Sequence, residues 1–539
     1  MSTSLLFGDA EAALKRKTAV SPAADLWRHL VSRWEGVAAR VAASGPFEQG
    51  VLGHHSMTPM VVEAAAIWRL SGRDDARAYA RQRIDDLLAA YAPLLADPPP
   101  VAPPKVRLFL HSHAEAALAA DLLRDVLPDA TCAALARLMR DVCIPHTCFE
   151  HALTGYGSGS NVPLARNLDA AVCALAWGAA SGCDGWETVV DHTCDNVRQY
   201  LRNGCDADGF SYEGTGYGGQ VMQMVFLFCH LLRQARWHDD LLRAEPRLRR
   251  LPDAFQHLIL PDGSFAATTN DSGHRAPMSL WWLLLAAREW DRPDCVGVWE
   301  HYSGPGHPVR PWGDTWPSWT ALAGTDPRHI EHVDKTLLLT FCYWDPAAPR
   351  QPVAASPLPT AVCAEGSGTA TFRTSWNRDA LFAAILGGGR VDLAIGGEYL
   401  AVDTGRYNTN EDQHSVVLID GANRHPSSAP GKGMCYDQTS GRLGRFQRHP
   451  LLDYCVTALR MQTILMPLMV VQIVIAQYYQ ATGRPTRSII LSLTRQFIFL
   501  IPLYYALPVF VGAFIPSLEQ LHGFILGPPV ADFLSFLLA

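Results

Sequence analysis

One short segment, CDADGFSYEGTGYGGQ at residues 205–220, combines titratable side chains with several glycines. It places Tyr212, Glu213 and Tyr217 around a glycine-rich turn that leads into an apolar helix. The glycines allow the backbone to bend tightly, which would leave the aromatic hydroxyls facing a cleft. A tyrosine in that position could act as a general acid or base, and the alternative is that the turn is purely structural.

The elements that must position this segment are predicted to be helices over residues 23–330. Apolar residues recur three and four positions apart, as in MTPMVVEAAAIWRLSG and MSLWWLLLAAREW, and Gly or Pro separates the runs. Helices of this length in pairs suggest an α-solenoid or an α/α-toroid over residues 1–330. Residues 335–425 hold short segments rich in β-branched and aromatic residues, including KTLLLTFCYW and EYLAVDTG, and we predict an antiparallel β-sandwich there.

Length and composition limit what the chain can be. With 539 residues it is too long for one compact core, and about three structural units are expected. A formal charge of -7 argues against a general nucleic-acid binder, which normally has a basic surface. The 13 cysteines have no regular spacing, so we expect thiols in a reducing environment. The N-terminus has no long apolar core preceded by positive charge, so no secretory signal is expected.

The string DGFSYEGTGY resembles the signature of the heparinase II/III-like polysaccharide lyases, in which a turn of this type carries a catalytic tyrosine. SNVPLARNLDAAVCALAWG (160–178) resembles the helix that carries a substrate-binding asparagine, and FRTSWNRDALFAAILGGG (372–389) resembles the first strands of the family's sandwich. These matches run in the family's order through residues 50–425. The resemblance implies an α/α-toroid followed by a β-sandwich, and β-elimination of a glycan that contains uronic acid, such as heparin, heparan sulfate or alginate.

β-Elimination sets chemical demands that the resemblance assigns to particular residues. The proton α to the sugar carboxylate is weakly acidic, so the enzyme must neutralise that carboxylate and place an acid and a base nearby. By family match Tyr217 is the acid or base, Asn161 neutralises the carboxylate, and Asn167 is the second choice. Glu213 either orients Tyr217 or caps the following helix. The remaining candidates for substrate contact are Tyr212, which otherwise packs, and His54 and His55.

Asp403 and His414 match positions that bind a structural zinc in several members of the family. Without the resemblance, Asp403 would be a turn residue and His414 a strand or surface histidine. The family's strand with an HxHxD-like element is missing, because no histidine occurs between Arg373 and Gln413, and the sandwich is truncated. The sequence therefore predicts an incomplete zinc site and a weakened lyase. The alternative is a module that binds an anionic glycan without cleaving it.

The C-terminal segment 456–539 contains three apolar stretches, at roughly 460–480, 489–511 and 521–539. The middle stretch exceeds the ~20 residues that a membrane-spanning helix needs. The QATGRP loop followed by LSLTRQFIFLIPL resembles the last helices of multidrug and toxin extrusion (MATE) transporters. We therefore predict about three transmembrane helices and a membrane-associated protein. Three helices lack the cavity of such an exporter, so they would serve as an anchor.

The junction at residues 426–455 is rich in Gly, Ser, Pro and Arg and reads as a loop. Both flanking pieces are incomplete there, since the sandwich stops early and the exporter-like part has few helices. We therefore hypothesise a chimeric or truncated reading frame. In that case the C-terminal part would be a fragment of a multidrug antiporter.

Overall fold

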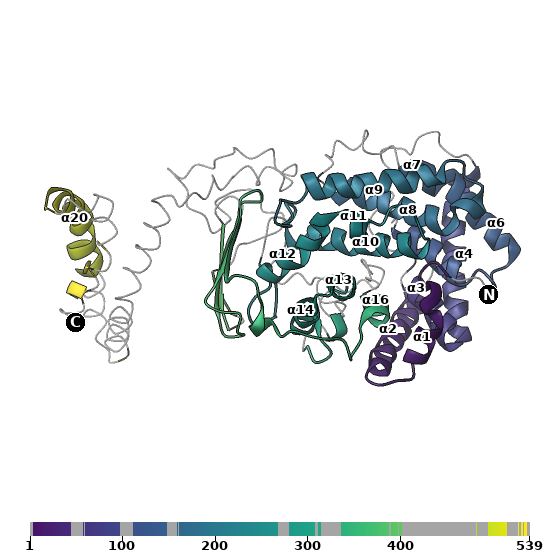
Figure 1. The fold of residues 1–539 in the computed structure, drawn as a ribbon, viewed down its shortest axis with the longest axis horizontal. Helices are drawn as coiled ribbons and strands as arrows, with labels where there is room; N and C mark the ends of the chain where they lie inside the picture. Colours follow the sequence, from purple (N-terminus) through teal and green to yellow (C-terminus); the bar gives the residue numbers. More distant parts are fainter. Residues whose placement is uncertain are drawn as a thin grey trace. The chain divides into compact units, whose positions relative to one another are not determined.

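The computed structural model divides into two compact units, Met1–Gly444 and Arg445–Ala539. The residues that it describes are 4–44, 58, 60–96, 111–147, 159, 161–267, 280–307, 311–313, 336–386, 390–396, 398–401, 481, 494–514, 527, 530–531 and 533–535. The first unit is mostly helical and contains one small antiparallel sheet (Figure 1). The second contains a π-helical turn, η10 (Thr494–Leu500), and helix α20 (Ile501–Phe514).

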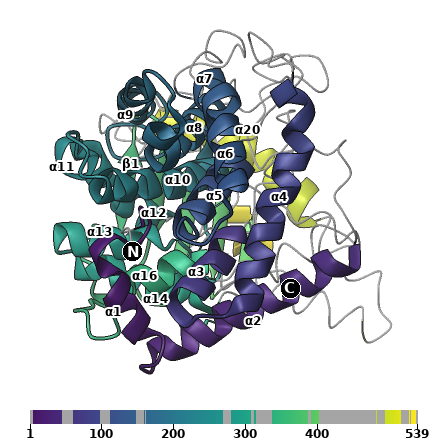
Figure 2. The same cartoon turned by 90° about the vertical axis from the view of Figure 1, so that its right-hand side faces the viewer.

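The long helices of the first unit pack against one another in a circuit. In order, α3 packs on α5, α5 on α8, α8 on α10, α10 on α13, α13 on α16, α16 on α2, and α2 again on α3. On the outside, α4 packs on α3 and α5, α9 on α8, and α14 on α13 (Figures 1 and 2). The helices of the circuit and its outer layer are α2 (Ala23–Ser44), α3 (Val61–Ser71), α4 (Asp74–Ala96), α5 (His111–Leu122), α8 (Asn161–Ser181), α9 (Trp186–Asn203), α10 (Gly214–Gln234), α13 (Trp282–Trp290), α14 (Pro293–Ser303) and α16 (Thr336–Tyr343).

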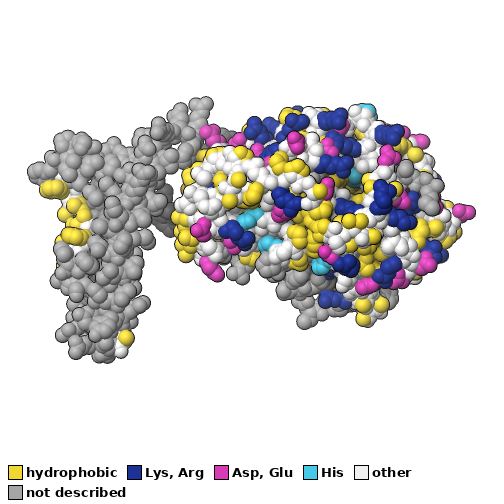
Figure 3. Space-filling model, turned by 60° about the horizontal axis from the view of Figure 1, so that its bottom comes forward, with side chains coloured by type: hydrophobic (Ala, Val, Ile, Leu, Met, Phe, Trp, Pro, Cys, Tyr) yellow, Lys and Arg dark blue, Asp and Glu magenta, His cyan; other side chains and the backbone are white. Residues whose placement is uncertain are grey.

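The sequence of each helix matches its place in this circuit. Every residue from Val61 to Ile67 of α3 is buried, as expected for a helix with neighbours on several sides. In the outer helix α9, by contrast, the apolar residues Val190, Cys194, Val197 and Leu201 recur four, three and four positions apart and form one buried stripe. Its other face is polar, and in Figure 3 Lys and Arg are interspersed with Asp and Glu over the visible surface of the first unit.

Shorter helices connect the circuit to the sheet. They are α1 (Glu11–Lys17), α6 (Asp129–Leu138), α7 (Ile144–Thr147), α11 (Leu241–Ala244), the 3-10 helix η5 (Pro246–Arg250) and α12 (Leu251–Leu258). The sheet is an antiparallel meander in the order β1 (Ala361–Ala364), β2 (Thr369–Arg373), β3 (Leu381–Leu386), β4 (Arg390–Ile395) and β5 (Glu398–Ala401). One face of the sheet packs on α12 through a small core that includes Phe210, Leu258, Phe382 and Ala384 (Figure 1).

One predicted strand is a helix. KTLLLTFCYW, which we assigned to the β-region, forms α16, and Thr336–Phe341 are all buried within the helical circuit. A short, continuously apolar run does not distinguish a buried strand from a buried helix, and here packing between α2 and α13 decides for the helix. The described strands begin only at Ala361 and form a single sheet; a second layer of the predicted sandwich is not among the described residues.

The predicted transmembrane helices are wrong. In the part of the chain that the structure describes, no helix combines the length and the apolar character that crossing a bilayer requires. Helix α20 has 14 residues. At 1.5 Å per residue that is roughly 21 Å, short of the ~30 Å hydrocarbon core. The predicted stretches at 460–480 and 521–539 fall mostly outside the described residues. The membrane-associated localisation and the exporter-like anchor are corrected accordingly, and the chimeric reading frame that rested on them loses its basis.

Candidate active site

The N-terminal ends of α8 and α10 meet, and Glu213 joins them. Glu213 directly precedes α10, and its Oε1 accepts a hydrogen bond of 2.9 Å from the backbone N–H of Asn161, the first residue of α8. Its Oε2 lies 3.3 Å from the donating hydroxyl of Tyr200 on α9. The carboxylate is 2% exposed. Glu213 thus caps α8, a helix that begins 52 residues earlier, and places a negative charge at its positive end.

The glycines of this region permit close packing between elements. A Cβ on Gly218 would lie 2.4 Å from the Ser211 Oγ, so glycine lets the segment before α10 pack directly on that helix. A Cβ on Gly204 would lie 2.6 Å from the Gly159 carbonyl oxygen, so glycine also lets the chain before α8 approach the end of α9. These contacts bring the start of α8, the end of α9 and the start of α10 to one place.

Tyr217 lies in the first turn of α10 and is half-buried. The sequence predicts a glycine-rich turn before the helix. The structure places the helix start at Gly214, whose φ of 74° is left-handed and favours glycine, and the later glycines Gly216, Gly218 and Gly219 lie within the helix. Glycine is a poor helix former by about 1 kcal/mol relative to alanine, and the close packing at Gly218 offsets that preference. Tyr217 therefore has a fixed helical backbone beside the N-terminus of α8.

The two predicted asparagines lie on α8 but differ in exposure. Asn161, at the helix start, is 9% exposed, whereas Asn167 is 1% exposed and its carbonyl accepts a bond from the Thr193 hydroxyl. Of the two, only Asn161 is joined through its backbone to Glu213, the residue that directly precedes α10. Arg166, 4% exposed on the same helix, is not among the predicted site residues. A charged residue inside an apolar helix is the sequence signal that could have singled it out.

Tyr212 faces a different place from the predicted cleft. It lines an open pocket with Arg247 and Gly366, and the described lining of that pocket does not include Tyr217. Burial, and after it the charge of Asp206, raises the pKa of the Tyr212 hydroxyl. The structure thus separates two tyrosines that the sequence places five residues apart.

The other predicted site residues, His54, His55, Asp403 and His414, lie outside the described residues. The structural zinc implied for Asp403 and His414 therefore stays a prediction. Within the described ranges, no three His, Cys, Asp or Glu side chains are arranged to hold a metal ion.

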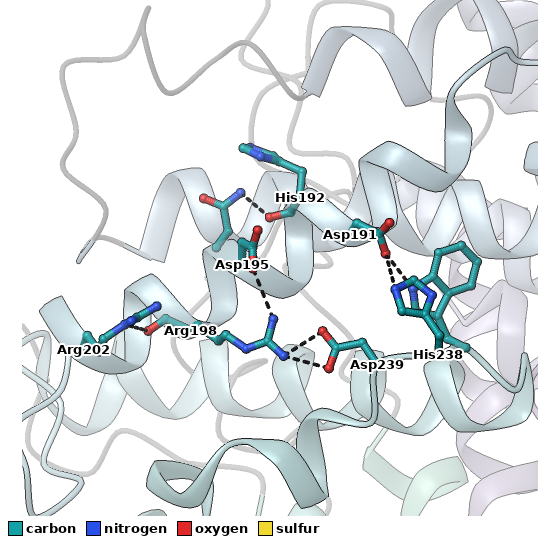
Figure 4. A network of polar contacts seen from close by, with 9 residues as sticks. Asp191, His192, Asp195, Arg198, Arg202, His238 and Asp239 are labelled. Carbon is teal, nitrogen blue, oxygen red and sulfur yellow. Dashed lines mark hydrogen bonds and ion pairs between the residues drawn. The ribbon is translucent and has the colours of Figure 1, made fainter.

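A polar network on the outer side of α9 has a structural role (Figure 4). The Asp191 carboxylate accepts a 2.9 Å bond from the Trp237 indole and lies 3.3 Å from the His238 ring. Arg198 donates two bonds of 2.7 Å to the Asp239 carboxylate. These contacts hold the segment after α10 against α9, and His238 is largely exposed.

We expect Glu213→Gln to destabilise the protein by about 1–2 kcal/mol, because an amide keeps one acceptor but removes the charge at the N-terminus of α8. The free energy of unfolding in urea measures this effect. Glu187→Gln is the matched control, since Glu187 is in the first turn of α9 and exposed. A Glu213→Gln protein as stable as the Glu187→Gln protein would contradict the capping role.

Comparison with known proteins gives matches only among solved structures. No family model matches the chain, and neither does any curated protein. Consequently neither the lyase resemblance nor the exporter resemblance of the sequence has a matching family model. The crystal structure of heparinase III is similar with a TM-score of 0.45 and 10% identity, over 67% of this chain and 54% of that one.

Two further structures are similar to a lesser degree. A second heparinase III structure has a TM-score of 0.39 and 12% identity, over 64% of this chain and 50% of that one. The heparan sulfate lyase HepC from Pedobacter heparinus has a TM-score of 0.36 and 12% identity, over 65% and 49% of the two chains. The chain spans about half the length of the solved structures it matches.

Proposed function

We propose that the chain is a polysaccharide lyase that cleaves a uronic-acid-containing glycan by β-elimination. The observation that supports the proposal is the hydrogen bond by which Glu213 joins the N-terminus of α8, which begins at Asn161, to the N-terminus of α10, whose first turn contains Tyr217. Helix N-termini carry partial positive charge, which favours a bound carboxylate. An amide donor and a tyrosine hydroxyl beside such a site would supply two of the groups that β-elimination requires, one to neutralise the carboxylate and one to transfer a proton.

In the proposed mechanism each residue has one task. The Asn161 amide donates to the sugar carboxylate, so that the negative charge formed when the α-proton leaves can delocalise into it. Tyr217 transfers a proton at the scissile bond, either from the carbon or to the leaving oxygen. Glu213 is a positioning residue, because its carboxylate holds the start of α8 against the start of α10.

One feature favours a second candidate, an anionic-glycan-binding module without activity. The described strands β2 to β5 contain no histidine, and the sequence has none between Arg373 and Gln413. A lyase that lacks one of its proton-transfer groups loses about 10²–10⁴-fold in rate. Binding of an acidic glycan without release of product would select this candidate.

The test is a lyase assay on the full chain with heparosan, heparan sulfate, alginate and hyaluronan. β-Elimination leaves an unsaturated uronate whose conjugated bond absorbs in the ultraviolet. We expect Tyr217→Phe to lower the rate by about 10²–10⁴-fold, because only the proton-transferring hydroxyl is removed. Tyr79→Phe on α4 removes the same group from an outer helix and should retain the rate. Unchanged activity in Tyr217→Phe would refute the role of Tyr217, and no product from any of the four glycans would refute the lyase proposal.

A further inference from the structure

A hollow lies between the helical circuit and the sheet. It is an open pocket of about 540 Å³. One wall comes from the end of α9, the segment that follows it and η5, and the other from the turn between β1 and β2. Its volume is within the ~300–1,000 Å³ typical of small-molecule sites. The charged lining residues are Arg202, Arg247, Asp206, Asp208 and Glu365.

Asp206 has a structural role in the pocket, because both of its carboxylate oxygens accept hydrogen bonds from backbone N–H groups. Its Oδ1 accepts bonds of 2.9 Å from the backbone N–H groups of Asp208 and Phe210, and its Oδ2 accepts one of 3.2 Å from that of Ser367. The carboxylate thus joins the helical wall to the sheet wall. Gly366 completes the junction, since a Cβ there would lie 2.6 Å from the Asp206 Cβ.

The two basic lining residues are Arg202 and Arg247. Each guanidinium is anchored by one hydrogen bond to a backbone carbonyl, and each has further N–H donors. Arg202 Nε donates to the Arg198 carbonyl at 3.1 Å, and Arg247 Nη1 donates to the Leu201 carbonyl at 2.8 Å. Neither Arg202 nor Arg247 forms an ion pair in the described part of the chain. Arg198 differs in this respect. It lies one turn before Arg202, and its guanidinium forms ion pairs with Asp195 and Asp239 (Figure 4).

The two acidic lining residues come from both walls, Asp208 from the segment after α9 and Glu365 from the turn between β1 and β2. Asp208 and Glu365 act on the Cys363 thiol, whose pKa is raised by burial and then by these two charges. The positive charge of Arg247, in contrast, lowers the pKa of the Tyr212 hydroxyl and partly opposes the effect of burial. Among the described residues, neither carboxylate comes within ion-pair distance of an arginine. Two cationic and two anionic side chains therefore line one hollow and, among the described residues, form no ion pair with one another.

Because these four charged side chains line one pocket and form no ion pair with one another, we infer that the pocket binds a disaccharide unit carrying both a carboxylate and a free amine, that is, a uronate linked to an amino sugar without an N-acyl group. The carboxylate would bind between Arg202 and Arg247, and the ammonium group would bind Asp208 and Glu365. A second anionic group in place of the amine would face two carboxylates and be repelled. The inference rests on the proposed function for the nature of the glycan, and it adds which sugars the chain selects.

Calorimetric titration of the full chain with two matched disaccharides tests the inference. One has the free amine and the other is N-acetylated at the same nitrogen. We expect the free-amine disaccharide to bind at least about tenfold more tightly, because N-acetylation removes the charge-assisted bonds to Asp208 and Glu365. Arg247→Met and Asp208→Asn should each weaken its binding by about tenfold or more. Arg249→Met, on the same 3-10 helix, is the control and should bind as the unaltered chain does.

Equal affinity for the two disaccharides, binding that is unaffected by Arg247→Met, or no binding at all would overturn the inference. The lyase assay keeps the two proposals apart. Free-amine selective binding without unsaturated product leaves the pocket standing and refutes the lyase. Product formation with no effect of Arg247→Met or Asp208→Asn on disaccharide binding leaves the lyase standing and refutes the pocket.

Discussion

Arg373→Met is expected to lower the free energy of unfolding by about 3 kcal/mol, or more, because it removes the only buried cation that joins β2 to α12 among the described residues. Arg373 Nη2 lies 2.8 Å from the His257 carbonyl oxygen, 3.0 Å from that of Ile259 and 3.4 Å from that of Gln256. These are carbonyls at the end of α12, where a helix has no partners of its own and carries partial negative charge.

Two aromatic rings complete the environment of this guanidinium. Its Cζ lies 3.9 Å from the centroid of Trp376 and 5.2 Å from that of Phe382. Burial lowers the pKa of Arg373 to about 9, so the group remains charged at neutral pH. Methionine has a similar length but donates no hydrogen bond, and it would leave the helix carbonyls buried and unpaired.

Urea unfolding followed by circular dichroism measures the loss. Arg378→Met is the matched control, since Arg378 is exposed and donates one bond of 2.9 Å to the Asp262 carbonyl. We expect the control to change stability by less than about 0.5 kcal/mol. Arg373→Lys keeps the charge but not the planar fork, and should fall between the two. An Arg373→Met protein as stable as Arg378→Met would show that the sheet is held to α12 by its apolar core alone.

The helices were predictable because their apolar residues repeat with the helical period over many turns. The strings chosen for α3, α4, α5 and α13 all form helices in the structure. Segments of eight residues or fewer carry no such periodic signal. The residues of α16 are continuously buried, and only their neighbours distinguish a helix from a strand. The prediction of transmembrane helices from the C-terminal apolar stretches was wrong for a related reason. Hydropathy indicates burial in any apolar environment and does not give the length of a continuous helix.

The side chains of the site were visible in the sequence, but their partners were not. Tyr217 and Asn161 were singled out from local strings. The bond from Asn161 to Glu213 spans 52 residues, and the bond from Ser367 to Asp206 spans 161. A single sequence contains no record of such contacts, because they depend on how the helices and the sheet pack. The same holds for Arg373, which in the sequence is one arginine among many.

A second large effect is expected on acidification: the protein should lose most of its stability between pH 6.5 and pH 4. Burial lowers the pKa of His113, His230 and His257 from 6.5 to about 4 in each case. These three histidines make the unfolded chain bind three more protons than the folded one within this window, and His301, whose pKa burial also lowers, acts in the same direction. The stability that these histidines contribute is fully present above pH 6.5 and is lost as the pH falls through 4. Each contributes about 3 kcal/mol.

The surroundings of each ring explain why it stays neutral. His113 is 1% exposed and packs against the edge of Tyr91 with ring centroids 4.5 Å apart. His257 lies beside the charged Arg373, which disfavours a second cation. His230 Nε2 must donate its hydrogen to the Leu6 carbonyl at 2.8 Å, because a carbonyl only accepts, and so Nδ1 accepts from the Tyr343 hydroxyl. Protonation would remove that acceptor. The nearby Arg288 and Arg233 also oppose a positive charge.

Unfolding free energies measured in urea at half-unit steps from pH 7.5 to pH 4 test this prediction. The slope should approach about 4 kcal/mol per pH unit near pH 5, which corresponds to three protons, less an offset from carboxyl groups. That offset has the opposite sign, because burial raises the pKa of Asp121 and of Asp206, so these groups favour the folded state as the pH falls. His113→Phe should reduce the slope by about one proton, or roughly 1.4 kcal/mol per pH unit. Replacing the exposed His238 with Gln is the control. If His113→Phe and the control gave the same slope as the unaltered chain, the buried histidines would not be what limits stability in acid.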